Sequence, residues 1–288
     1  MKKIFSTKLI ALVLVNLICY SVTVYSYIPN SKWILSKWAE NNNSGNVYFE
    51  QEIQLQGKGQ IYFLKEQWLV DNEGSMKVLV KGSRDLADKI QFQIQYNTNI
   101  RTMTPNWMTQ RTPVGLDFYE PLFFYKSPQR IVQFLVKNKI LNTDISNSKN
   151  YQKVDNSYIH TPEDFIRLGR TSGVISIIFG PQPQVDSKDT KNLGVWLDQD
   201  KFFVLKIRGV SLAELNIDKW QLSYKGVYLP KDRTYLWEDK IASAKLGEAK
   251  PISASHRLIF NKPIEMYPPD FDDSALKELL LNFYSKFR

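Results

Sequence analysis

The sequence predicts a mainly β protein with helices (α+β), built around an antiparallel sheet that has one apolar and one polar face. Alternating strands, turn residues between them and a closing amphipathic helix predict this class. In residues 46–56, Val47, Phe49, Ile53 and Leu55 fall on one face, interrupted only by Gln51. The apolar face of such a sheet must be covered by another part of the protein or by a ligand. The function therefore depends on what covers that face.

The first 26 residues predict an export signal. Lys2 and Lys3 precede a largely apolar run over residues 9–18, and Val24 and Ser26 stand where a signal peptidase cleaves. We therefore expect a periplasmic protein with a cleavable signal peptide at 1–26 and a single domain over 27–288. Cleavage would remove Cys19, the one cysteine of the chain, and with it any disulfide or thiol nucleophile.

The chain begins its folded part with a predicted amphipathic helix, in which Trp33, Ile34 and Trp38 share one side. Strands are predicted next, because apolar and polar residues alternate between turn residues such as Gly57-Lys58-Gly59. The predicted strands are 46–56, 59–70, 76–82 and 89–97. In the last of them Phe92 and Ile94 point to the apolar face.

Residues 104–128 interrupt this pattern. The segment is rich in aromatic residues, including Trp107, Phe123 and Phe124, and four prolines exclude a regular strand or a long helix. Two interpretations stay open for it, a lid over a cavity and a packed loop.

Helix and strand patterns alternate in the remaining chain. A helix is predicted over 129–141, and a short one starts at Thr161-Pro162-Glu163-Asp164 and ends near Gly169. Residues 209–213 are interpreted as a connector, and residues 213–218 as a polar helix-like stretch that follows it. The final helix starts near Asp273, with Leu276, Leu279, Leu280, Phe283 and Phe287 at helical spacing. The strands predicted here are 174–179, 195–198, 202–208, 219–224, 234–239 and 257–260.

No catalytic or metal-binding group stands out in the sequence. His160 and His256 have no catalytic partner nearby, and the segment around Ser211 lacks the second glycine of a nucleophile elbow. The aspartates near 198–200 and 270–273 resemble a hairpin turn and a helix start more than a calcium loop. We therefore expect no enzyme, no cofactor and no metal. An esterase or glycan hydrolase using Ser211, His160 and His256 stays as a minor alternative.

The net charge of +9 is spread along the chain without a run of like charges. This excludes a nucleic-acid footprint and is compatible with a weak attraction to anionic surfaces. The apolar face has two possible uses. The closing helix fills it as plain core, or it leaves room for acyl chains.

Three sequence stretches resemble the periplasmic outer-membrane lipoprotein carriers, the LolA/LolB-like family. They are NVYFEQEIQL (46–55) with GKGQIYFLKEQWLVDNEG (57–74), GVWLDQDKFFVLKIR (194–208) and WQLSYKGVYLPKDRTYLW (220–237). The resemblance covers roughly residues 30–265 and lies in the order of strands. It implies a half-open antiparallel β-barrel with helices covering its concave face and a cavity for acyl chains. Lys65-Glu66-Gln67 stands where the carriers have a basic Arg-Pro turn, so no latch residue is transferred.

These observations predict a periplasmic binding protein that shields the acyl chains of a lipoprotein or lipid in transit to the outer membrane. Its expected partners are an acylated lipoprotein or lipid and a protein of the inner or outer membrane. The alternative is a lipid-sensing or lipoprotein-sensing regulator of the same fold that binds an inner-membrane partner. The predicted cargo-binding residues are Val47, Phe49, Ile53, Leu55, Phe92 and Ile94 on strands, with Trp107, Phe123 and Phe124 as cover.

Overall fold

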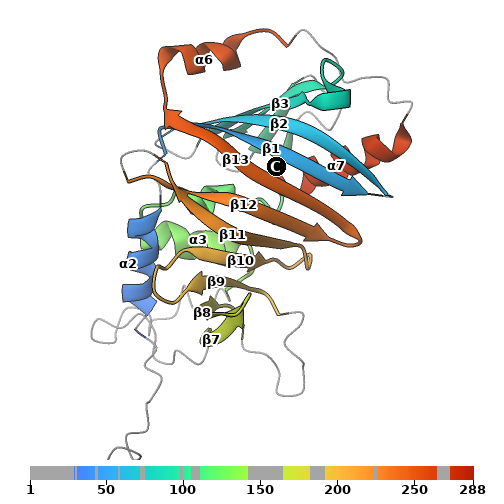
Figure 1. Cartoon of the computed structure of the whole chain (residues 1–288). Coiled ribbons are helices and arrows are strands. Elements are labelled where there is room, and N and C mark those ends of the chain that lie inside the picture. Colours follow the sequence, from blue (N-terminus) through green and yellow to red (C-terminus); the bar gives the residue numbers. More distant parts are fainter. Residues whose placement is uncertain are drawn as a thin grey trace, which may run out of the picture.

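Thirteen antiparallel strands form one continuous sheet in the computed structural model (Figure 1). The structure describes residues 29, 31–42, 45–57, 59–71, 75–97, 100–104, 111–141, 165–181, 192–223, 226–264 and 273–288. The strand order is β6-β5-β4-β3-β2-β1-β13-β12-β11-β10-β9-β8-β7, so β6 and β7 lie at the two edges and the sheet is not closed. This confirms the predicted fold class.

Consecutive strands are neighbours in the sheet except β6 and β7, and β1 pairs with β13 in the middle of the sheet. Their bounds are β1 Val47–Gly57, β2 Gln60–Val70, β3 Met76–Gly82, β4 Gln91–Asn97, β5 Ile100–Thr104, β6 Arg111–Pro113, β7 Ile166–Thr171, β8 Val174–Phe179, β9 Gly194–Asp198, β10 Val204–Arg208, β11 Glu214–Leu222, β12 Tyr228–Trp237 and β13 Lys240–Pro251.

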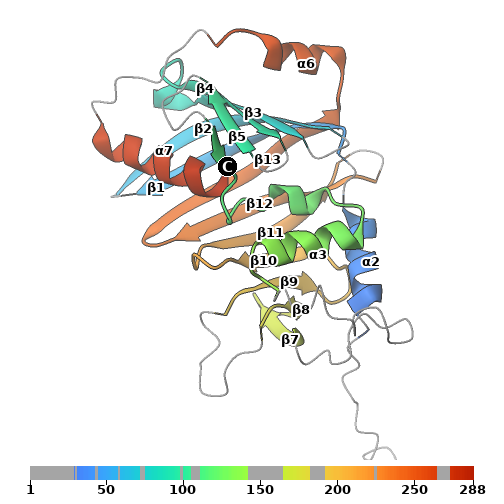
Figure 2. The same cartoon turned by 180° about the vertical axis from the view of Figure 1, so that it is seen from behind.

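Helices lie on both faces of the sheet (Figures 1 and 2). Those described are α2 Ser31–Asn41, α3 Pro128–Lys137, α6 Ala254–Asn261 and α7 Ser274–Phe287, with short 3₁₀ helices η1 Arg84–Leu86 and η2 Glu120–Phe123. Seen from behind, α3 and α7 lie in front of the sheet (Figure 2). Helix α6 packs on the opposite face, where Phe260 meets Tyr48, Leu69 and Leu79. We call the face under α3 and α7 the inner face.

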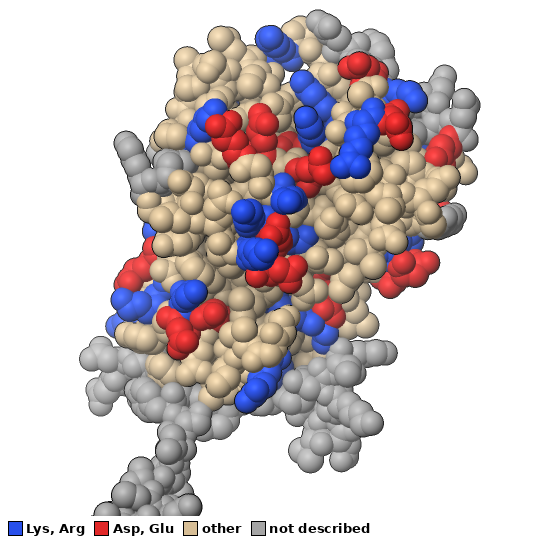
Figure 3. All heavy atoms as spheres, viewed as in Figure 1, with Lys and Arg blue, Asp and Glu red and all other residues tan. Residues whose placement is uncertain are grey.

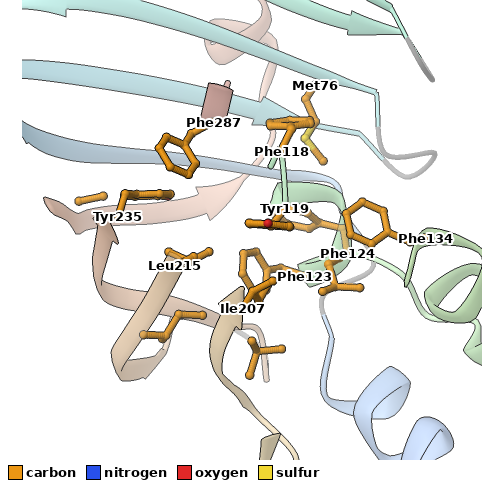
Figure 4. Packing of buried hydrophobic residues seen from close by; sticks show 14 of the residues in the cluster. Met76, Phe118, Tyr119, Phe123, Phe124, Phe134, Ile207, Leu215, Tyr235 and Phe287 are labelled. Carbon is orange, nitrogen blue, oxygen red and sulfur yellow. The ribbon is translucent and has the colours of Figure 1, made fainter. Parts of the chain in front are cut away.

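The register of the strands gathers the apolar residues on the inner face. Ile53 of β1 lies opposite Leu64 of β2 on one side and Ala244 of β13 on the other, and all three are buried. Side chains from β1–β5, β7–β13, α2, α3, η2 and α7 join in one hydrophobic cluster (Figure 4). Burial of this face is the main source of stability that the described structure shows.

Most predicted elements of the first half are confirmed. Strands β1 to β4 match the four predicted ranges within two residues, and α2, α3 and α7 match the predicted helices. Asp273 caps α7, since its carboxylate accepts hydrogen bonds from the backbone amides of Ala275 and Leu276, each at 3.0 Å.

Three predictions in the second half are wrong. Residues 166–169 belong to β7 and not to a helix, because Ser172 and Gly173, both at positive φ, turn the chain into a tight hairpin with β8; the predicted helix start, 161–164, lies outside the described residues. Residues 257–260 belong to α6, where Ser253 and His256 form a capping box. Residues 214–218 open β11, since Leu215 and Ile217 alternate into the core.

Replacing Phe283 tests whether α7 is part of the cooperative core. Its ring is fully buried and lies 5.5 Å from that of Tyr235 and 5.8 Å from that of Trp237. We expect Phe283→Ala to lower the free energy of unfolding by about 3–5 kcal/mol in urea titrations. The exposed Lys277→Ala in the same helix should change it by less than about 0.5 kcal/mol. Equal, small effects of both changes would show that α7 adds little to the core.

Candidate functional site

The predicted cargo-binding residues converge on the inner face, where all that the structure describes are buried. The six strand residues are at most 2% exposed, and the two aromatic residues of the η2 segment at most 6%. Those eight are Val47, Phe49, Ile53, Leu55, Phe92, Ile94, Phe123 and Phe124; Trp107 lies outside the described residues. They are thus covered in this structure, and the cover decides whether a ligand reaches them.

Helix α7 is a major part of that cover. Its apolar side carries Leu276, Leu279, Leu280, Phe283 and Phe287, all at most 5% exposed. Phe287 packs on Tyr235 of β12, with ring centroids 5.0 Å apart (Figure 4), and Tyr284 meets Phe92 of β4 edge to face at 4.9 Å. At its other end Leu279 lies against Gly57, where a Cβ atom would stand 3.3 Å from it.

A second layer of cover comes from the segment around η2. Tyr119, Phe123 and Phe124 lie between the sheet and α3 (Figure 4), and Phe123 packs edge to face on Trp220 of β11 at 5.8 Å. The aromatic insertion thus takes part in the core over the residues described. Its backbone also touches α7, because a Cβ at Gly115 would lie 3.2 Å from the carbonyl oxygen of Lys286.

Two acids and two arginines are buried inside this apolar layer, and we call Glu66, Glu120, Arg233 and Arg288 the inner charge cluster. Each is at most 3% exposed. Nε of Arg288 lies 3.2 Å from both carboxylate oxygens of Glu66, and its Nη1 lies 3.3 Å from Oε1 of Glu120. Nη1 of Arg233 donates to the same Glu120 oxygen at 2.5 Å. The four formal charges cancel.

Neutral donors complete the cluster. Glu66 also accepts hydrogen bonds from Nε1 of Trp68 at 2.8 Å and from the hydroxyl of Tyr284 at 2.9 Å. Gln51 bridges the two halves, since its amide donates to Glu66 and accepts from Arg233. Its burial explains the polar interruption in the apolar pattern of β1. A buried amide at this position is needed to satisfy charged neighbours.

The cluster keeps Arg288 charged. Burial opposes the charge of its guanidinium, but the fields of Glu66, Tyr235 and Glu120 outweigh it, and the pKa of Arg288 lies well above its usual value. The guanidinium also lies over the ring of Tyr235, 4.9 Å from its centroid. Removing one partner from such a group leaves an uncompensated charge in a medium of low polarity.

Arg101 of β5 holds the end of α7 through its backbone. Its Nη1 donates to the carbonyl oxygens of Tyr284 at 2.5 Å and of Arg288 at 2.7 Å. A cation at this place satisfies carbonyl groups that the helix cannot pair and favours the negative end of its dipole. Burial lowers the pKa of Arg101.

The start of α7 is fastened to the sheet by an exposed polar contact. The hydroxyl of Tyr62 on β2 donates to Oδ2 of Asp273 at 2.7 Å. Desolvation of Tyr62, followed by this bond, raises the pKa of Tyr62 to about 12, and the bond lowers the pKa of Asp273. Polar contacts thus hold both ends of α7, and apolar side chains hold its middle.

The opposite face of the sheet is polar. A groove of about 630 Å³ crosses β1, β2, β3 and β13 there and is lined by Glu50, Glu52, Lys65, Gln67, Lys81 and Lys245, among others. Basic and acidic side chains are interspersed over this face (Figure 3). His256, one of the two histidines, lies here and stacks on Tyr48 with ring centroids 4.1 Å apart.

Ser211 does not meet a histidine among the described residues. Its hydroxyl donates to Oδ2 of Asp117 at 2.5 Å, and Tyr119 donates to Oδ1 of the same carboxylate at 2.9 Å. This contact fastens the η2 segment to the β10–β11 turn. His256 lies on the opposite face of the sheet, so the structure does not bring Ser211 and His256 together; His160 lies outside the described residues.

In the part of the chain that the structure describes, no three His, Cys, Asp or Glu side chains are grouped as a metal site would require. Asp198 accepts from the amides of Asp200 and Lys201, the expected turn chemistry. None of the helices described has the length and apolar character needed to cross a membrane.

Comparison with solved structures finds similar folds at low sequence identity. A LolA superfamily protein from Nitrosomonas europaea has 10% identity and a TM-score of 0.46, covering 80% of this chain and 97% of its own. A candidate outer membrane lipoprotein-sorting protein domain from Vibrio parahaemolyticus has 10% identity and a TM-score of 0.45, covering 80% and 98%. A DUF1329 family protein from Desulfovibrio piger has 10% identity and a TM-score of 0.43, covering 77% and 92%. No family model and no curated protein matches the sequence.

A double-mutant cycle tests the inner charge cluster. We expect Glu66→Gln and Arg288→Gln each to lower the free energy of unfolding by about 3–5 kcal/mol, because each leaves the buried cluster with one uncompensated charge. The double variant should lose clearly less than the sum. The surface pair Glu52 and Arg84, 3.6 Å apart and about half exposed, serves as control and should couple by less than about 1 kcal/mol in urea titrations. Additive losses at Glu66 and Arg288 would contradict the assigned pairing.

Proposed function

We propose that this protein is a periplasmic carrier whose inner face shields the acyl chains of a lipoprotein or lipid in transit to the outer membrane. The observation that carries the proposal is the nature of the cover. Helix α7 lies on the apolar inner face by side-chain contacts, and none of the strand pairs described depends on it. Its displacement would expose an apolar surface without breaking a strand ladder.

The contacts of α7 suit a cover that opens. Its apolar residues pack on rings of the sheet, and its polar ends rest on Tyr62, Glu66 and Arg101. Acyl chains entering beneath it would replace one apolar partner by another. Each buried methylene then contributes about 0.8 kcal/mol, so a chain of ordinary length offsets much of the cost of displacing one amphipathic helix.

The predicted cargo residues take their roles from this opening. Phe92, which now packs on Tyr284, and the strand residues beside it would line the exposed groove. Phe123 and Phe124 would form its far wall next to α3. Release requires a membrane or partner protein that offers the acyl chains a better apolar environment, and no covalent chemistry is involved.

The first test is to identify what the protein carries. Native mass spectrometry of protein purified from the exported fraction of its cells, followed by organic extraction, should find bound lipid or acylated peptide. A clean unliganded mass, together with no uptake of a fluorescent acyl probe, would refute the carrier role and leave the inner face as plain core.

A reversible cross-link tests the opening of α7. Tyr62→Cys and Asp273→Cys, in a Cys19→Ser background, place two thiols where the side chains now meet. A short cleavable bismaleimide across them should lower acyl-probe uptake at least tenfold, and cleavage should restore it. A control pair within α2, Lys37→Cys and Glu40→Cys, should have no effect, since that contact does not involve α7. Equal uptake with α7 locked would show that ligands do not enter beneath it.

A further inference from the structure

The end of α7 presents a cationic group and a hydrogen-bond acceptor to two strand residues, Glu66 and Arg101. The guanidinium of Arg288 meets the carboxylate of Glu66, and the backbone carbonyl oxygen of the same residue meets the guanidinium of Arg101. Arg288 thus presents a cation through its side chain and a hydrogen-bond acceptor through its backbone. The groups that receive them are buried, at 0% exposure for the Glu66 side chain and 6% for Arg101.

Displacing α7 would remove the charged partner of Glu66 and the carbonyl partners of Arg101. Glu120 would keep the salt bridge to Arg233 at 2.5 Å. Glu66 would keep only neutral donors among the described residues, Trp68 and Gln51. Arg101 would keep the hydroxyl of Thr112, which accepts from it at 3.2 and 3.0 Å. Glu66 without the guanidinium of Arg288, and Arg101 without the carbonyl oxygens of α7, would then face an apolar groove.

We propose that the opened groove selects an amphiphile whose headgroup pairs an anionic phosphate with a primary ammonium, as in an ethanolamine phospholipid. The phosphate would take the place of the α7 carbonyl groups on Arg101, and the ammonium would replace Arg288 at Glu66. This inference rests on the proposed function and names the chemistry of its cargo. It follows from charge complementarity at two buried groups.

The reach of such a headgroup matches that of the residue it replaces. The chain of bonds from a carbonyl oxygen to Nε of an arginine is one bond longer than that from a phosphate oxygen to the nitrogen of phosphoethanolamine. Arginine–phosphate contacts are charge-assisted and bidentate. A primary ammonium donates hydrogen bonds to a carboxylate, whereas the quaternary ammonium of choline cannot.

Other headgroups would leave a buried charge without a partner. A glycerol phosphate satisfies Arg101 but brings no cation to Glu66. A choline phosphate brings a cation that cannot donate to the Glu66 oxygens. A buried ion that loses its partner keeps the whole desolvation cost, so both lipids should bind less well than the ethanolamine lipid.

Competition between lysophospholipids with the same acyl chain tests this selection. The full chain is mixed with equal amounts of lysophosphatidylethanolamine, lysophosphatidylglycerol and lysophosphatidylcholine, and native mass spectrometry measures the bound fractions. We expect the ethanolamine lipid to be favoured at least tenfold over each of the others. The cost of opening α7 lowers all affinities by the same factor, so the ratios report the headgroup alone.

Two variants assign the preference to its residues. Glu66→Gln should reduce the ratio of ethanolamine to choline lipid to near one, even though loss of the Arg288 contact makes α7 easier to displace. Arg101→Gln should weaken all three lysophospholipids relative to a monoacylglycerol with the same chain, because loss of the contacts to α7 eases its opening for every ligand by the same factor. Arg84→Gln on the opposite face should leave every ratio as in the wild type.

The outcomes separate the two proposals. Binding of all three lysophospholipids and the monoacylglycerol at equal levels would overturn the headgroup selection and leave the carrier role intact. Absence of binding by every one of them, with the protein folded, would overturn both. A tenfold preference that survives Glu66→Gln would also overturn the assignment to the inner charge cluster.

Discussion

The contact that fixes the position of α7 on the sheet is the burial of Arg288 against Glu66 inside an apolar layer. Apolar side chains alone allow a helix to slide or rotate on a sheet, because their contacts are not directional. A buried ion pair does not, since a small displacement leaves two charges without partners. The pair on β2 and α7 thus fixes where the helix lies, and Arg101 and Asp273 fix its ends.

The sheet is shaped for this helix. The inner face of β13 carries the small residues Ala242 and Ala244, which lie opposite Leu55 and Ile53 of β1, and β1 ends at Gly57 beside Leu279. Larger residues on β13 would crowd an inner face that is already buried. The same choice makes the sheet incomplete alone, because rows of small side chains do not fill an interior at native density.

Local patterns predicted most of the fold, and the failures have physical causes. Alternation in β1 to β4 is plain because one face is polar and the other apolar. In β13 small residues take the place of large apolar ones on the inner face, so the sequence lacks the alternation of large apolar and polar residues that predicts a strand. In α6 the capping box of Ser253 and His256 outweighs a short β-like pattern. The site was predicted only in part. Gln51 stood out as an interruption, but its partners Glu66 and Arg233, and the Glu120 that pairs with Arg233, come from other segments, and no local pattern joins them.

The inner charge cluster gives the molecule more than stability. Apolar residues of similar volume often stabilise an interior as well as a buried ion network does. An apolar interior would also hold α7 without a defined position and, once opened, would accept any acyl chain. Under the proposed function the charged groups would change both properties, because Arg288 pairs with Glu66 when α7 is in place and a ligand with matching charges would be needed once α7 is displaced. The cover and the selection of cargo would then follow from the same few residues, with α7 occupying the place of the ligand until one with the right headgroup displaces it.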